Sequence, residues 1–260
     1  MKILVIGEQC KDVHIYCKCE RLCPEAPVPV LIPLEKTENF GMAGNTAQNL
    51  SSLLEKDDIV HLIHSGSKST KTRYIDKTSG YIVVRIDEND IHLRIGEDVT
   101  LDRYKNFDAI VISDYNKGFL LENDIQRIAE FAKYNNIITL LDSKKKILGD
   151  WSKNIDFIKV NLKEYNILKD NLGKPENYCQ NLIVTLGEEG SACVNKNITI
   201  KGKKVPVYNL SGAGDSYLAG LVIKYLETKD IKESMSYANK VAAIAVSKAG
   251  VIAVKKGEVK

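Results

Sequence analysis

Short apolar runs alternate with amphipathic stretches along most of this chain of 260 residues. The stretch 122–135 places Ile125, Ile128 and Ala132 on one face at helical spacing, and an alanine-rich stretch over 233–249 stops at a glycine. Apolar runs without alternation are typical of parallel strands that helices cover on both faces. Strands are expected at 2–7, 108–113, 137–142, 156–160, 181–185 and 191–194. The pattern therefore predicts a doubly wound, mostly parallel α/β core with ligands at the carboxyl ends of its strands.

Two stretches, 13–40 and 70–95, interrupt that alternation. Each looks like a pair of strands without a covering helix, and the second contains a turn at 77–80 between two strand-like runs. Such strands are expected to form a small sheet that projects from the core and serves as a lid over a small ligand. The length fits one α/β domain with an appendage as well as two domains, and we predict a single domain over 1–260 with the lid strands inserted in it.

The segment 209–220 carries the strongest chemical signal. Gly212, Ala213 and Gly214 precede Asp215 where a helical pattern begins. A glycine turn at a helix start leaves backbone N–H groups unpaired and available to phosphate oxygens. A carboxylate in that position makes sense if it takes a proton from an attacking hydroxyl while the N–H groups hold the developing charge. This arrangement predicts a kinase, and the alternative is an ordinary helix start in which the aspartate interacts with the helix dipole.

Composition narrows the range of partners. The 37 basic and 34 acidic residues nearly balance, so neither a nucleic-acid nor an acidic-membrane partner is expected. The apolar runs are too short to span a bilayer and the N-terminus shows no secretory signal, so a cytoplasmic protein is expected. The six cysteines include no C-x-x-C pair and are predicted to be free thiols, with metal binding by the 10–23 cluster as the alternative. The basic runs 68–73 and 144–146, each taken alone, are predicted to be solvated surface.

Motifs over nearly the whole chain resemble, in the same order, those of the ribokinase-like (PfkB) sugar kinases. They are Gly41-Met42-Ala43-Gly44-Asn45, Asn161-Leu162-Lys163-Glu164, Thr185-Leu186-Gly187-Glu188-Glu189-Gly190 and the Gly212 to Asp215 signature. The resemblance implies a Rossmann-like core, a β-sheet lid, and ATP-dependent phosphorylation of a sugar hydroxyl with magnesium.

A narrower resemblance lies in the proline-punctuated stretch 21–30, R-L-C-P-E-A-P-V-P-V, which is similar to that of D-glycero-β-D-manno-heptose-7-phosphate kinases. The stretches 70–73 and 113–118 resemble the same subgroup. Those kinases are the kinase halves of bifunctional ADP-heptose synthases. The resemblance therefore implies phosphorylation of the anomeric O1 of heptose 7-phosphate to the 1,7-bisphosphate, for ADP-heptose and lipopolysaccharide biosynthesis. No H-x-G-H motif is present, so no nucleotidyltransferase domain is expected.

The resemblance also assigns roles around the transferred phosphoryl group. Asp215 is the base, and the backbone N–H groups of the 212–214 turn hold the γ-phosphoryl oxygens. Asn161 and Glu164 are expected to orient Mg²⁺ through water, because this ion keeps much of its hydration shell. The alternative for the same pair is a capping box at a helix N-terminus. The nucleotide side is assigned to Thr185, Gly187, Gly190, Lys144 and Asn239, the last of these near the adenine.

Sugar recognition is assigned to Asp12, Gly44, Asn45 and Glu25. A short carboxylate and an amide suit hydroxyls that both donate and accept, although Asp12 and Asn45 are equally common in turns and helix caps. A substrate that already carries a phosphate also needs cations. The candidates are Arg73, Lys71, Lys117 and Lys144, and the sequence leaves the choice among them open.

Several features depart from the family pattern. Met42 stands where relatives usually have glycine, which is expected to narrow the sugar pocket or shift its backbone. Asn209 stands where aspartate is common, which puts a monovalent-cation site in doubt. The segment between 49 and 70 is shorter than expected by about one helix–strand unit, and a homodimer through the lid is expected. A kinase of another sugar or sugar phosphate, and a non-catalytic sugar- or nucleotide-binding protein, are the alternatives.

Overall fold

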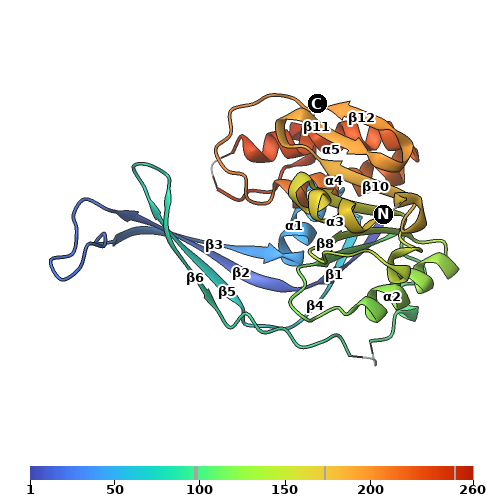
Figure 1. Ribbon diagram of the computed structural model, residues 1–260, viewed down its shortest axis with the longest axis horizontal. Coiled ribbons are helices and arrows are strands. Elements are labelled where there is room, and N and C mark those ends of the chain that lie inside the picture. Colours follow the sequence, from blue (N-terminus) through green and yellow to red (C-terminus); the bar gives the residue numbers. More distant parts are fainter. Residues whose placement is uncertain (97–98, 173, 249, 260) are drawn as a thin grey trace.

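The computed structural model describes residues 1–96, 99–172, 174–248 and 250–259, and a sheet of eight strands lies at its centre (Figure 1). The strands are β1 (Lys2–Gly7), β4 (Ile59–His64), β7 (Ala109–Asp114), β8 (Ile138–Ser143), β9 (Phe157–Asn161), β10 (Asn181–Thr185), β11 (Gly190–Cys193) and β12 (Ile198–Lys201). Their order is β12-β11-β10-β9-β8-β7-β1-β4. The strands from β4 to β10 pair in parallel, whereas β11 and β12 add an antiparallel edge. The predicted mostly parallel sheet is confirmed.

Helices pack against both faces of this sheet. They are α1 (Ala43–Leu53), α2 (Glu122–Tyr134), α3 (Leu162–Leu172), α4 (Ala213–Thr228) and α5 (Ile231–Val246). Side chains of α1, α4 and α5, such as Leu50, Leu218 and Met235, belong to one buried apolar cluster. Those of α2 and α3, such as Ile128 and Leu168, belong to another. Two apolar layers with the sheet between them make the core doubly wound, as the sequence predicts.

The periodic pattern located most of these elements closely. Each of the six strands expected from the sequence begins and ends within one residue of an observed strand. The expected helix over 122–135 is α2, and the alanine-rich helix is α5, which begins at Ile231. Ala249, where that helix was expected to end, lies outside the described residues. The pattern did not identify β12, whose four residues alternate between half-buried and exposed at the sheet edge.

A second sheet, here called the lid, projects from the body as an arm (Figure 1). Its strands are β2 (Gln9–Lys18), β3 (Ile32–Met42), β5 (Thr70–Asp76) and β6 (Ile82–Glu88), in the order β3-β2-β5-β6. Strand β2 begins earlier than the expected position 13, because only Glu8 separates it from β1. Strand β6 ends at Glu88, so the residues 89–95 add no strand to the lid. The expected small β-sheet beside an α/β core is therefore present.

The segment between α1 and β5 is short. It contains β4 and no helix, and β4 is the last strand at its end of the large sheet. Ile59 on this edge strand is 47% exposed. The described residues thus leave this sheet edge uncovered, as expected for a chain that lacks an edge unit.

Two expectations from composition can be compared with this fold. None of the helices in the described ranges is both long enough and apolar enough to cross a bilayer. All six cysteines are free thiols, and Cys10 and Cys17 are buried in β2. Among the described residues, no three histidine, cysteine or acidic side chains gather as a metal site.

Candidate active site

The glycine turn opens helix α4, as the sequence predicts. Gly212 adopts a left-handed conformation with φ of 80° at the N-cap, and Ala213 begins the helix. A Cβ atom at position 212 would lie 2.9 Å from Asn45 Nδ2, so both the angle and the space favour glycine there. Gly212, Ala213 and Gly214 line a cavity of about 550 Å³. The first N–H groups of a helix have no partner within it, so this turn can hold phosphate oxygens.

Asp215 lines the same cavity and is 7% exposed. Its Oδ2 accepts a hydrogen bond from Asn45 Nδ2 at 2.6 Å, and its Oδ1 accepts one from Thr46 Oγ1 at 3.0 Å. Burial and the negative charge of Asp142 raise the pKa of Asp215 to about 6, although the two hydrogen bonds and Lys159 act to lower it. A carboxylate whose pKa lies just below neutrality is ionised at pH 7 and can accept a proton there.

A polar network fixes helix α1 against helix α4 around this carboxylate. Asn49 Nδ2 donates to the backbone oxygen of Asn45 at 2.9 Å and to its Oδ1 at 3.2 Å. Ser216 Oγ donates to Asn49 Oδ1 at 2.8 Å. The network orients the Asn45 amide so that its NH₂ group faces Asp215. Asn45, assigned to the sugar from sequence, thus contacts Asp215 in this structure.

A chain of paired charges lies beside the glycine turn, and its members Lys159 and Asp142 are buried. Lys159 Nζ is 2.5 Å from Asp142 Oδ2, and Lys144 Nζ is 3.5 Å from Asp142 Oδ1 and 2.5 Å from Glu164 Oε1. Burial would raise the pKa of Asp142, but Lys159 and Lys144 outweigh it and lower that pKa. A Cβ atom at Gly214 would lie 2.9 Å from Lys159 Nζ, so this ammonium group reaches the glycine turn itself. Positive charge is thereby placed where a phosphoryl group would bind.

The basic runs are not plain solvated surface, contrary to the sequence prediction. Lys144 is held by two carboxylates, and Lys145 Nζ lies 3.3 Å from the buried Asp114. In the other run, Lys71 is 7% exposed and the side chain of Arg73 is 14% exposed. Charge runs are usually solvated, but here Lys144, Lys145 and Arg73 pair with carboxylates and Lys71 is buried.

The pair Asn161 and Glu164 forms the capping box at the start of α3. Glu164 N donates to Asn161 Oδ1 at 2.8 Å, and Asn161 N donates to Glu164 Oε2 at 2.9 Å. The capping interpretation is therefore correct, and Asn161 also lines the cavity, whereas Glu164 contacts the lining residue Lys144. Asp142 Oδ1 is buried without a hydrogen-bond partner, and Asp142 and Asn161 line the same cavity. Carboxylate and amide oxygens of this kind fit Mg²⁺ that is bound through water.

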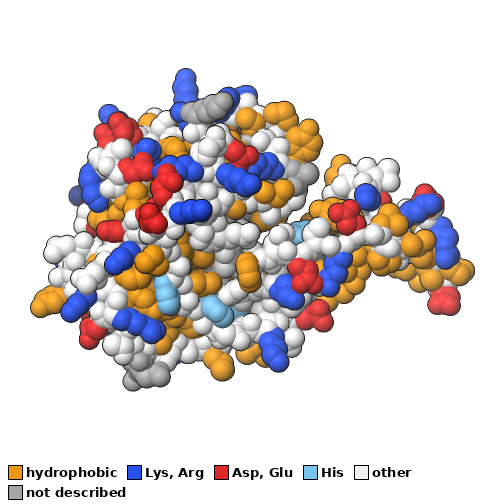
Figure 2. All heavy atoms as spheres, turned by 180° about the vertical axis from the view of Figure 1, so that it is seen from behind, with side chains coloured by type: hydrophobic (Ala, Val, Ile, Leu, Met, Phe, Trp, Pro, Cys, Tyr) orange, Lys and Arg blue, Asp and Glu red, His pale blue; other side chains and the backbone are white. Residues whose placement is uncertain are grey.

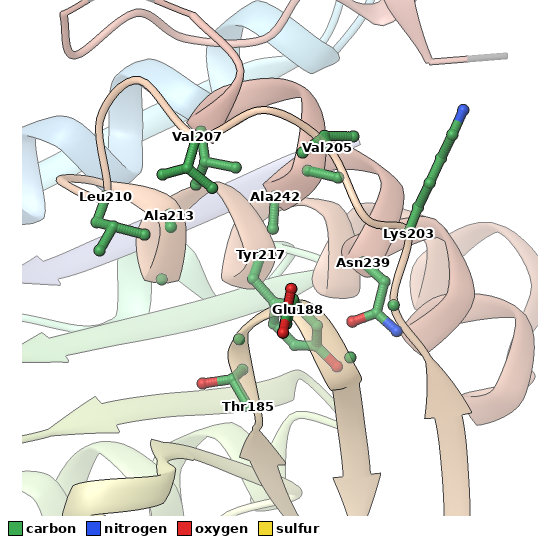
Figure 3. Close-up of a pocket in the computed structure, with 16 residues that line it drawn as sticks. Thr185, Glu188, Lys203, Val205, Val207, Leu210, Ala213, Tyr217, Asn239 and Ala242 are labelled. Carbon is green, nitrogen blue, oxygen red and sulfur yellow. The ribbon is translucent and has the colours of Figure 1, made fainter.

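A second cavity, of about 180 Å³, adjoins the first (Figure 3). Asn239 on α5 lines it and also donates through Nδ2 to the backbone oxygen of Ile200 at 3.1 Å. Gly190, with φ of 99°, lines it too, and a Cβ atom there would lie 2.2 Å from that same backbone oxygen. Lys203 points away from the cavity (Figure 3). The two cavities share four lining residues, which are Thr185, Gly187, Ala213 and Gly214. The second cavity is lined further by mostly apolar side chains, namely Val205, Val207, Leu210, Tyr217 and Ala242. An apolar slot continuous with a phosphate-binding turn suits a nucleotide base.

On the lid, Asp12 and Arg73 form a partly buried ion pair. Arg73 Nη1 donates to Asp12 Oδ1 at 2.7 Å. A Cβ atom at Gly41 would lie 2.6 Å from Asp12 Oδ2, so the glycine leaves room for this carboxylate. Lys117 Nζ lies 2.6 Å from Asp90 Oδ2 in a second pair. Asp12 and Lys117 were predicted for the substrate, whereas Asp90 gave no sequence signal because it lies in a polar segment without a motif.

Tyr115 lies between Lys71 of the lid and the cavity that Asp215 lines. It lines the cavity of Asp215, and the negative charge of Asp215 is the largest cause that raises the pKa of its phenol. The Nζ atoms of Lys71 and Lys144 lie 5.8 and 5.7 Å from its ring centroid. Glu8, which is fully buried, accepts hydrogen bonds from the backbone N–H groups of Tyr115 and Lys117. Sequence reasoning missed Glu8, because one acidic residue after a strand carries no spacing signal.

Of the predicted sugar ligands, Glu25 lies far from this cluster, whereas Gly44 lies beside Asn45 at the start of α1. Glu25 is exposed in the loop between β2 and β3, at the far end of the arm from the body (Figure 1). A Cβ atom at Gly44 would meet Phe40 Cβ at 3.0 Å and Gln9 Cγ at 3.2 Å, so Gly44 packs closely against the lid strands β2 and β3.

The departures from the family motifs have local structural counterparts. Met42 keeps a positive φ of 57° at the N-cap of α1 and is 4% exposed. It thus holds a conformation that glycine adopts without strain, at a cost of about 1–3 kcal/mol for another residue. Asn209 Oδ1 accepts a hydrogen bond from Ser211 N at 2.9 Å, so its amide stabilises the turn before Gly212.

The sequence and fold were compared with those of known proteins. The pattern of the pfkB family carbohydrate kinases matches residues 34–256. The chain belongs to this family. It is therefore an ATP-dependent sugar kinase rather than a binding protein without activity, and kinases of this family use ATP with a divalent metal.

The relatives in sequence and in structure agree with this assignment. The chain is 32% identical to the bifunctional protein HldE of Helicobacter pylori over 96% of its own length, and 30% identical to that of Campylobacter jejuni over 100%. It spans 63% and 64% of those proteins. Ribokinase from Thermotoga maritima superposes with a TM-score of 0.76 at 17% identity, covering 99% of this chain and 97% of that one. Phosphofructokinase-2 from Escherichia coli, solved with potassium, gives 0.74 at 15% identity, covering 99% and 96%. These likenesses show the fold.

Proposed function

We propose that this kinase phosphorylates the anomeric O1 of D-glycero-β-D-manno-heptose 7-phosphate to give the 1,7-bisphosphate. The observation that carries the chemistry is the buried Asp215 at the glycine turn, with its pKa raised to about 6. The heptose assignment is supported by the 21–30 motif and by sequence similarity to the kinase-length part of bifunctional relatives. A place in ADP-heptose and lipopolysaccharide biosynthesis is part of the same proposal.

In the proposed reaction, Asp215 accepts the proton of the O1 hydroxyl as that oxygen bonds to the γ-phosphorus. The bond from this phosphorus to the β–γ bridging oxygen breaks, and ADP leaves with the electron pair. The N–H groups of the 212–214 turn hold the equatorial oxygens, and Lys159 places positive charge under the turn. Asn45 and Thr46 keep the Asp215 carboxylate in one orientation. Mg²⁺, held through water near Asn161, Glu164 and Asp142, would supply further neutralisation of phosphate charge when bound.

The substrate can be tested by ADP release. We expect turnover on D-glycero-β-D-manno-heptose 7-phosphate, with at least a tenfold lower kcat/KM on fructose 6-phosphate and on ribose, since loss of well-placed polar contacts costs about 1.4 kcal/mol or more. Equal or better turnover on fructose 6-phosphate or ribose would keep the kinase and refute the heptose assignment. A kinase of another sugar phosphate is the second candidate, favoured by Met42, which is buried within the glycine motif where relatives usually have glycine.

We also propose that two copies pair through their lids. Figure 2 shows hydrophobic side chains along the projecting arm. On β6, Ile82, Val84 and Ile86 are 55%, 42% and 43% exposed, and on β3, Leu34 is 56% exposed. Apolar side chains that stay exposed on both edge strands of the lid favour burial against a partner. The ribokinase-fold neighbours include a tetrameric phosphofructokinase-2.

Replacement of Ile86 by Asp should convert a dimer of twice 29.0 kDa into a monomer, because a charge buried in an apolar interface is strongly unfavourable. Light scattering coupled to gel filtration measures the mass. Ile167→Asp is the matched control, since Ile167 on α3 is 42% exposed and lies outside the lid. A wild-type monomer, or a dimer that survives Ile86→Asp, would refute pairing through this face.

A further inference from the structure

Lys71 on β5 is the most unusual charge in the cleft. The residue is 7% exposed, yet no described carboxylate lies within ion-pair distance of its ammonium group and no described oxygen accepts a hydrogen bond from it. Its Nζ lies over the ring of Tyr115, 5.8 Å from the ring centroid. A buried ammonium group without an acceptor is costly, and proteins seldom keep one without a use for it.

The neighbouring acids Asp12, Asp90 and Asp87 each pair directly with another cation, and none of them forms an ion pair with Lys71. Asp12 pairs with Arg73 at 2.7 Å, and Asp90 pairs with Lys117 at 2.6 Å. Asp87, the residue opposite Lys71 on β6, is held by Arg85 through two hydrogen bonds at 2.7 and 2.8 Å. The three acids and their three partners balance. Among these four cations of the described lid and cleft, Lys71 is the one without a carboxylate partner.

The location of this charge fits a group on the substrate that does not react. Lys71 and Lys144 contact the same tyrosine ring, but Lys144 is held by Asp142 and Glu164 at the phosphoryl-transfer cavity. Lys71 belongs to the lid, directly opposite Asp12 in the β2–β5 register. A sugar between lid and body could thus place its reacting hydroxyl at Asp215 and another substituent at Lys71.

We propose that Lys71 binds a phosphate group already present on the sugar substrate. This inference rests on the proposed sugar-kinase function and deepens it: the substrate class is a phosphorylated sugar, whichever sugar it is. It also selects among the cations, because Arg73 and Lys117 have carboxylate partners at 2.7 and 2.6 Å and Lys71 has none. A phosphate supplies the strong, charged acceptor oxygens that the buried ammonium group lacks.

The test compares Lys71→Met with wild type on matched pairs of substrates, heptose 7-phosphate with heptose and fructose 6-phosphate with fructose. We expect kcat/KM for the phosphorylated member to fall about 10- to 100-fold, mainly through KM, because one charge-assisted hydrogen bond is lost. The kcat/KM for the unphosphorylated member should change less than about threefold. Lys71→Arg should restore part of the preference. Lys68→Met is the control, since Lys68 is exposed and lies just before the same strand.

Thermal shifts separate this inference from the heptose assignment, because they require no turnover. Lys71→Met should melt no lower than wild type without ligand, and the shift that each sugar phosphate gives to the wild type should be lost. If heptose 7-phosphate gives neither turnover nor a thermal shift but fructose 6-phosphate gives the results described above, the heptose assignment is refuted. The role of Lys71 in binding the phosphate is then still supported. The inference is overturned if no sugar phosphate shifts the melting temperature of the wild type. It is also overturned if Lys71→Met lowers kcat/KM equally for the phosphorylated and unphosphorylated members of a pair, or if Lys117→Met removes the preference for the phosphorylated member and Lys71→Met does not.

Discussion

Asp215→Asn is expected to lower kcat for sugar phosphorylation by about 10²–10⁴-fold, because the amide cannot take the proton from the attacking hydroxyl. The affinity for ATP should stay within about threefold, since the nucleotide cavity shares the glycine turn but not the carboxylate. ADP release in a coupled assay measures the first quantity, and calorimetric titration with ATP measures the second. A variant that keeps more than a tenth of the wild-type rate would exclude Asp215 as the base.

The pH profile gives a second test of the same residue. The wild-type kcat/KM should fall as pH decreases through about 6, because protonation of Asp215 removes the base. The residual activity of Asp215→Asn should lack this acidic limb.

The substitution Asp215→Asn should raise the stability of the fold, although it lowers the activity. Burial and Asp142 raise the pKa of Asp215 from 3.8 to about 6, so the folded state binds this proton more tightly than the unfolded chain does. The ionised group therefore destabilises the fold, by an amount that grows as pH rises from about 4 to 6 and is complete above that. Asp215→Asn removes this cost, so its free energy of unfolding at pH 7.5 should exceed that of wild type by up to about 3 kcal/mol. The gain should vanish below pH 4, and thermal melts across this range would show it.

The sequence was informative where a local rule applies and less so where long-range pairing decides the outcome. Strand and helix positions follow from periodicity, and the glycine turn follows from the need for a positive φ at Gly212. The capping box at Asn161 follows from its three-residue spacing to Glu164. No local rule predicts that Asp142 and Lys159, from adjacent strands, form a buried pair, or that Glu8 holds the 115–117 backbone.

The lysines also show that local sequence rules do not predict long-range pairing. In sequence, Lys71 and Lys68 belong to one basic run, and no property of either residue tells them apart. In the fold, Lys71 lies within β5 and is buried, whereas Lys68 precedes the strand and is exposed. A choice among Arg73, Lys71 and Lys117 therefore required the pairing of each with its acid. The departures at Met42 and Asn209 could likewise be interpreted only from the local backbone. Met42 keeps a positive φ, and Asn209 accepts a hydrogen bond within a turn.

Lys159→Met is expected to have the largest effect on stability. The side chains of Lys159 and Asp142 are 4% and 7% exposed, so removal of one partner leaves a buried charge without its main counterion. Such changes typically cost about 3–5 kcal/mol of unfolding free energy. Lys153→Met is the matched control, because Lys153 is 53% exposed in its ion pair with Asp150 and should contribute less than about 1 kcal/mol. Urea denaturation of the two variants measures both values.

The double variant Lys159→Met with Asp142→Leu separates folding from chemistry. Replacement of both charges by apolar side chains should recover most of the lost stability, since the uncompensated carboxylate is gone. Activity should not return, because Lys159 Nζ lies under Gly214, where the phosphoryl group would gather negative charge. In Lys159→Met alone, the uncompensated Asp142 should raise the pKa of Asp215 further and move the acidic limb of kcat/KM to higher pH. A double variant that regains both stability and wild-type turnover would show that this lysine serves the fold and not phosphoryl transfer.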